Sequence, residues 1–544
     1  MTDLDTLKLH LDTLKLRRRV AQLIAPWNKP DSPGVAAGVV RGGELVVEEQ
    51  AGMASLELGV PIGKQTTFRI ASVSKQFTCA AILMLAEEGR LRVDDDVHQY
   101  IPELPHYGDR ITLDHLMHNT SGLRDMLEIM RAGGADLSIP VRPQDLMDGI
   151  MRQRTLNFAP GSRYLYSNTN FLLLGRVVER VSGEKLRDFL QRRIFDPAGM
   201  SSTCMVESTT EVVRGLATGY FPAPGGGWMR AQHGFPLHGE GALVSCVADL
   251  ALWHRNYSTG AVGGPALLAA LAERAPFNNG RLNTYARGLQ VTEVRGQATI
   301  SHGGLWPGYK TEFLRIPGHD AAVIVIANNA VADPYAIGQQ IMAAIVEGAP
   351  GLHPVPPLPG AEALGRWAGR FLDRDAPATV DIAVSDGGVL TGSTNGLPFS
   401  VRAEEDGRLT AARTSRDFTM RLSEDGESLE VEQDAGVSCT YRRIATGAAL
   451  PADLPGAYRS PEMAATWTIA EKGGAMSFTI SGPVTQAGPW EVEPVEGDII
   501  RLISPSTLYR GWYDARVLRN SAGAVTGLVV NGNRVKNLRL DRQG

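Results

Sequence analysis

The sequence predicts an α+β domain over residues 1–346, followed by two smaller antiparallel β-barrels. Three observations support this fold class. The first domain has strand patterns at both ends and helical patterns between them, a proline-rich linker follows at 347–365, and two β-rich blocks then open alike at 366–445 and 454–544. The total of 544 residues also exceeds what a single hydrophobic core usually fills, so several domains are expected.

The strands expected in the first domain come from two separate parts of the chain. The stretch "GVAAGVVRGGELVVEEQAG" predicts a hairpin that turns at Gly42-Gly43. Later strands are expected at 298–304, 310–317 and 321–329, and the intervening helices at 72–88, 169–182 and 185–194. Strands at both ends with helices between them predict that the two ends share one sheet.

The segment 347–365 contains five prolines and several glycines, which favours a linker. Beyond it, short alternating segments are joined by Asp-Gly or Gly-Gly turns, which are typical of antiparallel hairpins. A second break at 445–456 separates two blocks that begin with "GRWAGRFLDRDAPATVDI" and "LPGAYRSPEMAATWTI". The weak repeat, of about 90 residues, predicts two similar small barrels.

The N-terminal stretch repeats "DTLKL" and places Leu4, Leu7, Leu11 and Leu14 at helical spacing. An amphipathic helix is therefore expected. The favoured interpretation is a helix docked on the first domain, and the alternative is a dimerisation helix, so a homodimer is possible.

Composition excludes several classes of protein. Hydrophobic residues make up 43% and charged residues 21%, and the net charge of −5 argues against nucleic acid as a partner. No stretch is apolar enough to span a membrane, and no secretory signal is expected. The four cysteines are scattered, so reduced thiols and a cytoplasmic location are predicted. No cofactor is expected, and no metal, because the histidines form no metal-ligand motif and His115-x-x-His118 lacks a partner cluster.

A serine and a lysine three residues apart begin the helix predicted at 72–88. Ser72 and Lys75 would lie on one face of that helix, and a desolvated lysine can take the proton of a serine nucleophile. The first turn also leaves backbone N–H groups that favour developing negative charge. Serine is, however, a common helix cap, and Ser74 offers another partner for Lys75. The motif alone therefore favours a cap over a catalytic site.

Two further stretches carry candidate functional residues. Tyr166 and Asn168 lie in "FAPGSRYLYSNTN", on a turn before the apolar helix at 169–182, where a tyrosine near a cation can act in proton transfer. His302, Gly303 and Gly304 lie on a predicted strand, where glycines let a substrate approach the backbone closely. Each stretch alone is more commonly structural.

The order of the three motifs changes this assessment. Ser-x-x-Lys is followed about 90 residues later by Tyr-x-Asn, and after about 130 more by His-x-Gly. This set resembles the penicillin-recognising serine hydrolases, in the branch of class C β-lactamases, D,D-peptidases and D-aminopeptidases. The segments "SVSKQFTCA", "NTSGLRD", "FAPGSRYLYSN", "IFDPAGM" and "SHGG" look most like D-aminopeptidases.

The resemblance implies a fold and a set of roles. The first domain would have the serine β-lactamase/D,D-peptidase type of fold, an antiparallel sheet with flanking helices plus a helical subdomain, and two β-barrel domains would follow it. Ser72 would be acylated, Lys75 and Tyr166 would share the proton transfer, and Asn168 would contact the substrate amide. His302 would replace the lysine of the third motif. The backbone N–H groups of Ser72 and Leu305 would bind the oxyanion.

The histidine in the third motif favours an aminopeptidase over a carboxypeptidase or β-lactamase. A neutral His302 binds a substrate carboxylate less strongly than a lysine does. An aminopeptidase needs acceptors for an α-ammonium group, and Asp125 and Glu240 are candidates, although both are more commonly structural. In D-aminopeptidases a loop of the third domain enters the cleft, and the corresponding stretch would lie near 481–494.

The expected function is therefore the release of an N-terminal D-amino acid, D-alanine-like, from small peptides, amides or esters through an acyl-enzyme. One alternative is a broad carboxylesterase or D-amino acid amidase of the same fold. An alternative of another class is a non-catalytic binding protein.

Overall fold

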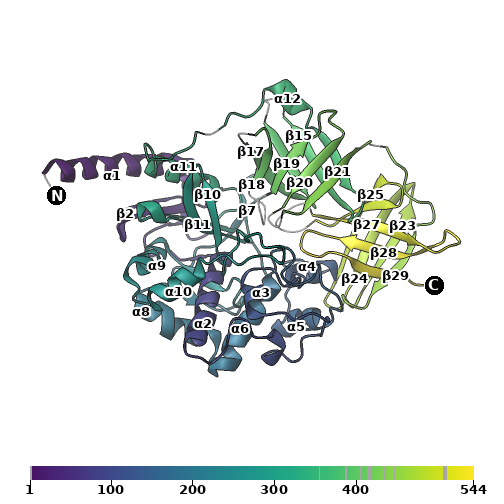
Figure 1. Cartoon of the computed structure of the whole chain (residues 1–544), viewed down its shortest axis with the longest axis horizontal. Coiled ribbons are helices and arrows are strands. Elements are labelled where there is room, and N and C mark those ends of the chain that lie inside the picture. The colour runs from purple at the N-terminus through teal and green to yellow at the C-terminus, as the bar shows by residue number, and fades with distance from the viewer. Residues whose placement is uncertain are drawn as a thin grey trace.

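The computed structural model describes residues 3–354, 356–385, 389–404, 406–412, 418–433, 436–445, 447–505 and 511–544. An α+β domain forms one side of the molecule, and two β-barrels lie together on the other side (Figure 1). Within the described ranges, no helix has both the length and the apolar character needed to cross a membrane.

One antiparallel sheet forms the centre of the first domain. Its strands are arranged in the order β10 (Gln290–Val294), β11 (Gln297–Trp306), β12 (Tyr309–Ile316), β13 (Ala321–Ala327), β1 (Val35–Arg41) and β2 (Glu44–Ala51). Val35 pairs with Ala327 and Arg41 with Ala321, so the two ends of the domain share the sheet as predicted. The predicted hairpin between β1 and β2 is also confirmed, and both glycines of its turn have positive φ.

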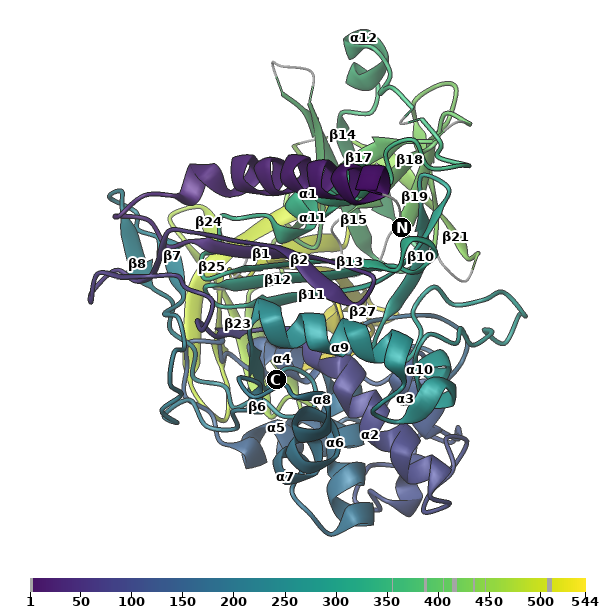
Figure 2. The ribbon, with the colours of Figure 1, turned by 90° about the vertical axis from the view of Figure 1, so that its left-hand side faces the viewer.

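Helices cover both faces of this sheet (Figure 2). One face packs against α1 (Asp3–Ile24) and α11 (Pro334–Ile345), and the other against a layer that includes α2 (Lys75–Glu87), α6 (Asn168–Ser182), α9 (Val247–Thr259) and α10 (Gly264–Leu271). Along β1, Val35 and Val39 belong to the first core, and Ala36 and Val40 to the second. Burial on both faces explains why β1 and β13 are continuous apolar runs.

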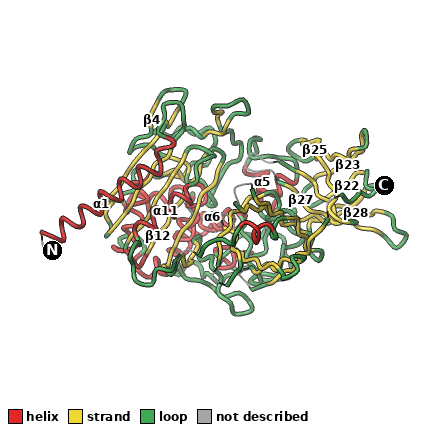
Figure 3. The backbone as a smooth tube through the Cα atoms, turned by 90° about the horizontal axis from the view of Figure 1, so that it is seen from above, coloured by secondary structure: helices red, strands yellow, loops and turns green. Residues whose placement is uncertain are grey.

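The N-terminal helix projects beyond the sheet at one end of the molecule (Figure 3). It docks through Leu16, Val20 and Ile24, which join the core beneath α11. The leucine face expected from the repeat is not the docked face, because Leu11 and Leu14 remain 49% and 37% exposed. The side chains of Leu4 and Leu7 lie outside the described residues.

The remaining elements surround the sheet and build the helical subdomain. The helices are α3 (Leu113–Met117), α4 (Met126–Ala132), α5 (Pro143–Met151), α7 (Leu186–Leu190) and α8 (Asp196–Ala198), with short turns η1 (Ala25–Trp27), η2 (Ala71–Ser74), η3 (Val97–Gln99), η4 (Gln191–Phe195) and η5 (Pro317–His319). The short strands are β3 (Met53–Ser55), β4 (Val60–Pro61), β5 (Phe68–Arg69), β6 (Cys204–Met205), β7 (Tyr220–Pro222), β8 (Trp228–Arg230) and β9 (Leu243–Ser245). The helix predicted at 72–88 is thus divided into η2 and α2, and that predicted at 185–194 into α7 and the π-helical turn η4.

The last residues of the predicted linker form the short helix α12 (Ala361–Gly365). Two closed antiparallel barrels follow, which confirms the predicted fold class. The first contains β14 (Gly369–Asp373), β15 (Ala378–Val384), β16 (Leu390–Thr394), β17 (Leu397–Ala403), β18 (Leu409–Ala412), β19 (Phe418–Leu422), β20 (Ser428–Glu432) and β21 (Ser438–Ile444). The second contains β22 (Gly456–Ser460), β23 (Ala465–Lys472), β24 (Ala475–Ser481), β25 (Gln486–Glu496), β26 (Ile499–Ile503), β27 (Trp512–Arg519), β28 (Val525–Asn531) and β29 (Leu538–Arg542). The Asp425-Gly426 turn lies between β19 and β20, whereas the Gly-Gly turn after β15 lies outside the described residues.

Helix α4 joins the second barrel to the first domain. Ile129 and Ala132 of α4 are part of the barrel's hydrophobic core, and Trp467 Nε1 donates to the Ala132 carbonyl at 2.8 Å. Just before α4, the buried guanidinium of Arg124 pairs with Glu462 of the barrel at 2.7 Å. Because these contacts bury apolar and charged groups together, the barrel holds a defined position beside the first domain.

Candidate active site

The turn that carries Ser72 is held in an uncommon conformation. It is the 3₁₀ turn η2, and Ala71 directly before the serine has φ of +48°, which is rare for residues with a Cβ atom. Ser74 stabilises this turn, because its Oγ donates to the Ala71 carbonyl at 2.6 Å and accepts the Leu243 N–H at 3.2 Å. Ser74, which had no predicted role beyond an alternative pairing, therefore supports the serine turn.

Lys75 is completely buried behind Ser72. Its Nζ donates to Ser72 Oγ at 3.1 Å, to Asn168 Oδ1 at 2.9 Å and to the Glu240 carbonyl at 2.6 Å. The pKa of Lys75 is lowered to about 7, chiefly by burial; the Glu240 charge acts against this shift, and the Arg534 charge adds to it. A lysine with such a pKa can be neutral near pH 7 and can accept the proton of the serine.

Tyr166 and Asn168 lie on the other side of Lys75, at the start of α6. The Lys75 Nζ lies 4.8 Å from the centroid of the Tyr166 ring, and Tyr166 forms a hydrogen bond with Ser72. Burial raises the pKa of Tyr166, so the phenol is protonated near neutral pH and available as a proton donor. The Asn168 amide is oriented by its partners: Oδ1 accepts from Lys75 and Nδ2 donates to Asp125 Oδ2 at 2.8 Å.

The two acidic candidates lie close to this network but differ in their partners. Asp125 is the N-cap of α4 and accepts hydrogen bonds from the backbone N–H groups of Leu127 and Glu128. It also accepts from the backbone N–H and from the side-chain Nδ2 of Asn168. Its oxygens are therefore occupied within the protein. Glu240 is equally buried; its Oε1 accepts the His238 N–H at 3.0 Å, and Oε2 has no hydrogen-bond partner. Burial raises the pKa of Glu240.

His302 lies on β11 and is neutral. Burial, together with the Lys75 charge, lowers its pKa to about 3. Nδ1 contacts the Gly303 carbonyl at 2.6 Å and must be the protonated nitrogen, so Nε2 accepts from the Tyr285 hydroxyl at 2.9 Å. Both ring nitrogens are thus engaged within the protein, and the ring packs 6.0 Å from that of Tyr166.

The two glycines after His302 have different neighbours. A Cβ atom on Gly304 would lie 2.2 Å from the Ile70 carbonyl oxygen, at the N-terminal end of the serine turn. Only glycine therefore lets β11 approach the turn this closely. A Cβ atom on Gly303 would lie 3.3 Å from the Glu312 carboxylate, on the opposite face of the strand.

A cavity of about 930 Å³ opens over the serine. Every predicted site residue other than Lys75 lines it: Ser72, Tyr166, Asn168, His302, Gly303, Gly304 and Leu305. Both barrels contribute to its walls, the first through residues such as Arg402 and Thr410, and the second through Asn533 and Arg534. The lining includes no residue of 481–494. The loop between β28 and β29 approaches the cavity instead, and the turn after β24 lies against Gly133 and Gly134.

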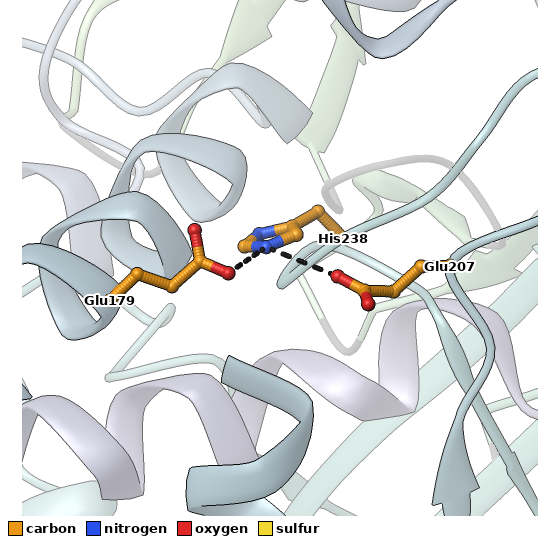
Figure 4. A group of neighbouring side chains, drawn as sticks. All are labelled: Glu179, Glu207 and His238. Atoms are coloured by element: carbon orange, nitrogen blue, oxygen red, sulfur yellow. Dashed lines mark hydrogen bonds and ion pairs between the residues drawn. The ribbon is translucent and has the colours of Figure 1, made fainter. Parts of the chain in front are cut away.

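One further group of titratable side chains converges within the part of the chain that the structure describes (Figure 4). His238 Nε2 lies 3.2 Å from Glu179 Oε1 and 3.8 Å from Glu207 Oε1, and these residue types can ligate a divalent cation. Arg176 already donates to the other Glu179 oxygen at 2.8 Å. The group therefore forms a polar network, in which His238 is hydrogen-bonded to Glu179, that holds the segment leading to Glu240.

Sequence reasoning missed three residues of this site. Tyr285 and Arg534 lie far from the three motifs in the chain, and only the fold brings them beside Tyr166. Ser74 was visible as a second serine in the first motif, but its partners, a backbone carbonyl and a backbone N–H from β9, depend on the tertiary structure.

A domain with helices on both faces of an antiparallel sheet, and with a Ser-x-x-Lys turn beside the glycine-containing strand β11, defines the class of proteins with the β-lactamase fold. The chain belongs to the beta-lactamase family, because the family model described as Beta-lactamase matches residues 16–345. A second model, described as D-aminopeptidase, domain B, matches residues 361–532. The family resemblance seen in the sequence is therefore confirmed.

Known proteins resemble the chain in sequence and in fold. A D-aminopeptidase from Brucella ovis is 27% identical over 511 residues, covering 92% of this chain and 93% of that protein. A D-aminopeptidase from Gluconobacter oxydans is 28% identical over 377 residues, covering 69% and 70%. Among solved structures, an octameric penicillin-binding protein homologue from Pyrococcus abyssi has a TM-score of 0.56 at 22% identity, covering 79% of this chain and 99% of that chain. A D-amino acid amidase from Ochrobactrum anthropi, complexed with D-phenylalanine, has a TM-score of 0.53 at 22% identity, covering 61% and 99%. At this identity the two structures support the fold alone.

Proposed function

We propose that the chain is a serine hydrolase that releases an N-terminal D-amino acid from small peptides, amides or esters through an acyl-enzyme. The observation that carries this proposal is the buried Lys75, whose Nζ lies 3.1 Å from Ser72 Oγ and whose pKa is lowered to about 7. The relatives named D-aminopeptidase, one of which aligns over 92% of the chain, support the choice of substrate.

Acylation begins with transfer of the Ser72 proton to neutral Lys75. As Oγ loses its proton to Nζ, it forms a bond to the substrate carbonyl carbon, and the carbonyl π electrons move to oxygen. The resulting oxyanion would be bound by the backbone N–H groups of Ser72 and Leu305. The tight approach of Gly304 to the serine turn brings β11 close enough for the two groups to act together.

Tyr166 completes the step. Its phenol is protonated and hydrogen-bonded to Ser72, so it can donate its proton to the leaving nitrogen as the C–N bond breaks. The protonated Lys75 returns a proton to the tyrosine and becomes neutral again. Water then attacks the acyl carbon as its proton passes to Lys75. The bond between that carbon and Ser72 Oγ breaks, and the protonated Lys75 returns the proton to Oγ as the D-amino acid leaves.

The charges in the cavity favour a substrate with a free amino group. His302 is neutral and both its nitrogens are engaged, so it supplies no cation for a substrate carboxylate. Glu240 lines the cavity, and its Oε2 has no hydrogen-bond partner. A substrate ammonium group would favour the ionised form of this carboxylate, so we assign Glu240 as its acceptor.

The proposal is tested with matched D- and L-alanine p-nitroanilides. The wild-type chain should hydrolyse the D-substrate at least about 100-fold faster in kcat/KM, and Ser72→Ala should reduce that rate to background. Equal rates on both enantiomers, or full activity of Ser72→Ala, would remove the proposal. Faster turnover of short acyl esters than of D-aminoacyl amides would favour the esterase alternative.

Glu240→Gln separates binding of the ammonium group from the chemistry. KM for D-alanine p-nitroanilide should rise by about tenfold, since a charge-assisted hydrogen bond to the substrate is lost. A p-nitrophenyl acetate substrate, which lacks the ammonium group, serves as the control and should keep its KM. An equal effect on both substrates would contradict the assignment of Glu240.

A further inference from the structure

The loop between β28 and β29, residues 532–537, is fixed to the first domain at several points. The Glu128 carboxylate accepts the backbone N–H groups of Asn533, at 2.8 Å, and of Arg534. Asn157 binds the same loop from the other side, donating to the Arg534 carbonyl at 3.1 Å and accepting the Lys536 N–H at 2.7 Å. The loop therefore has a defined backbone position relative to the catalytic residues.

Two further contacts limit the movement of this loop. A Cβ atom on Gly532 would lie 2.0 Å from Glu128 Oε1, so a larger residue would displace the anchoring carboxylate. The buried Arg124 donates from Nε to the Lys536 carbonyl at 3.2 Å. Glu128 lies in the first turn of α4, which begins directly after Asp125. The same short segment thus positions both the loop and the Asn168 amide.

The anchored loop carries the Arg534 side chain into the cavity. Its guanidinium carbon lies 4.7 Å from the centroid of the Tyr166 ring, and Nη1 lies 3.7 Å from Asp125 Oδ2. The side chain is 25% exposed and lines the cavity, so water screens its charge only in part. A cation over the face of a phenol ring is attracted by the ring, and more strongly when the phenol is ionised.

We propose that Arg534 is a positioning residue of the active site, supplied by the second barrel, whose charge keeps the proton network of Lys75 and Tyr166 ready to accept the Ser72 proton. This inference rests on the proposed function, because it assumes that Ser72 is activated through Lys75.

The charges around the network support this role. Arg534 is the cation that lowers the pKa of Lys75 in addition to burial, and it also opposes the rise in the pKa of Tyr166. The other titratable groups that face Lys75 and Tyr166 are Asp125, Glu240, the neutral His302, the neutral Tyr285 and the buried thiol of Cys79. Because both carboxylates raise the pKa of Lys75, removal of Arg534 would leave their effect uncompensated.

The expected consequence is a change in pH dependence. Without the Arg534 charge, Lys75 would keep its proton to higher pH. The midpoint pH at which the reaction rate of Ser72 rises would therefore increase by about one pH unit. The rate at pH 6 would then fall by about tenfold, whereas the rate at pH 9, where Lys75 is neutral in either case, would change little. A purely structural role would lower the rate equally at all pH values.

The experiment measures covalent labelling of Ser72 in the full chain by a fluorophosphonate, from pH 5.5 to 9.5. This reagent requires an activated serine but no D-amino acid. Arg534→Met removes the charge and retains much of the apolar stem, Arg534→Lys retains the charge, and Arg534→Gln serves as a second neutral variant should Met disturb folding. Arg539→Met is the matched control, because Arg539 is an arginine of the same barrel that is 60% exposed and pairs with Asp541.

Both neutral variants should show the upward shift of about one pH unit, with Arg534→Lys and Arg539→Met close to wild type. An unchanged midpoint in a folded neutral variant overturns the inference, and so does an equal loss of labelling at every pH. If the wild-type chain labels normally and only the shift is missing, the proposed function is unaffected. If Ser72 of the wild-type chain does not label at all, the proposed function and this inference fail together.

Discussion

Replacement of the buried Lys75 by methionine should stabilise the folded chain at acid pH and destabilise it at alkaline pH. An unperturbed lysine has a pKa of 10.5, whereas the pKa of Lys75 is lowered to about 7 in the folded chain. Because the folded-state value lies below the unfolded one, wild type loses stability as pH falls from about 10.5 to about 7, where the full penalty is reached. That penalty is roughly 5 kcal/mol, since each pKa unit corresponds to about 1.4 kcal/mol.

Lys75→Met removes this penalty but also removes three hydrogen bonds, to Ser72, Asn168 and the Glu240 carbonyl. At a net value of about 1 kcal/mol each, these bonds contribute roughly 3 kcal/mol to the stability of wild type. The variant should therefore be more stable than wild type by roughly 2 kcal/mol at pH 6 and less stable by roughly 2 kcal/mol at pH 10. It should also be inactive at both pH values.

Urea unfolding of the full chain at the two pH values, followed by tryptophan fluorescence, measures this difference. Lys64→Met is the control: Lys64 is 72% exposed and pairs with Glu48 at 3.6 Å, so its replacement should change stability by less than about 1 kcal/mol at either pH. A Lys75→Met effect of the same sign and size at pH 6 and pH 10 would refute the argument, because it would mean that Lys75 is not desolvated in its charged form.

Three further outcomes are expected. In wild type, kcat/KM for D-alanine p-nitroanilide should rise as pH increases through about 7, because Lys75 must lose its proton to act as a base; a flat profile between pH 5.5 and 8 would contradict this. Gly304→Ala should lower kcat by about 100-fold or more, since its Cβ atom would meet a backbone carbonyl at 2.2 Å, whereas Gly303→Ala, which meets the end of a glutamate side chain at 3.3 Å, should cost less than about tenfold. Ser74→Ala should lower kcat but leave KM near that of wild type, because the lost hydrogen bonds hold the serine turn and not the substrate; an unchanged kcat would exclude this role for Ser74.

Local patterns were sufficient to predict most of the fold. The turn at Gly42-Gly43 and the apolar runs of the central strands depend on residues adjacent in the chain, and the structure places these elements as expected. The helical N-terminus was also predicted, but its leucine spacing could not show which face is buried. That choice depends on α11 and β2, against which Leu16 and Val20 pack.

The sequence by itself determined the residue types of the candidate site and the order in which they occur. Ser72 and Lys75 face each other because they are three residues apart on one helical turn, a geometry that backbone hydrogen bonding alone imposes. Only the tertiary structure decided their electrostatics. The lowered pKa of Lys75 requires complete burial, and Arg534 reaches Tyr166 from a barrel whose contacts with α4 join parts of the chain about 400 residues apart. Burial and electrostatic interactions between distant parts of the chain depend on which surfaces pack together, and local sequence patterns cannot predict that packing.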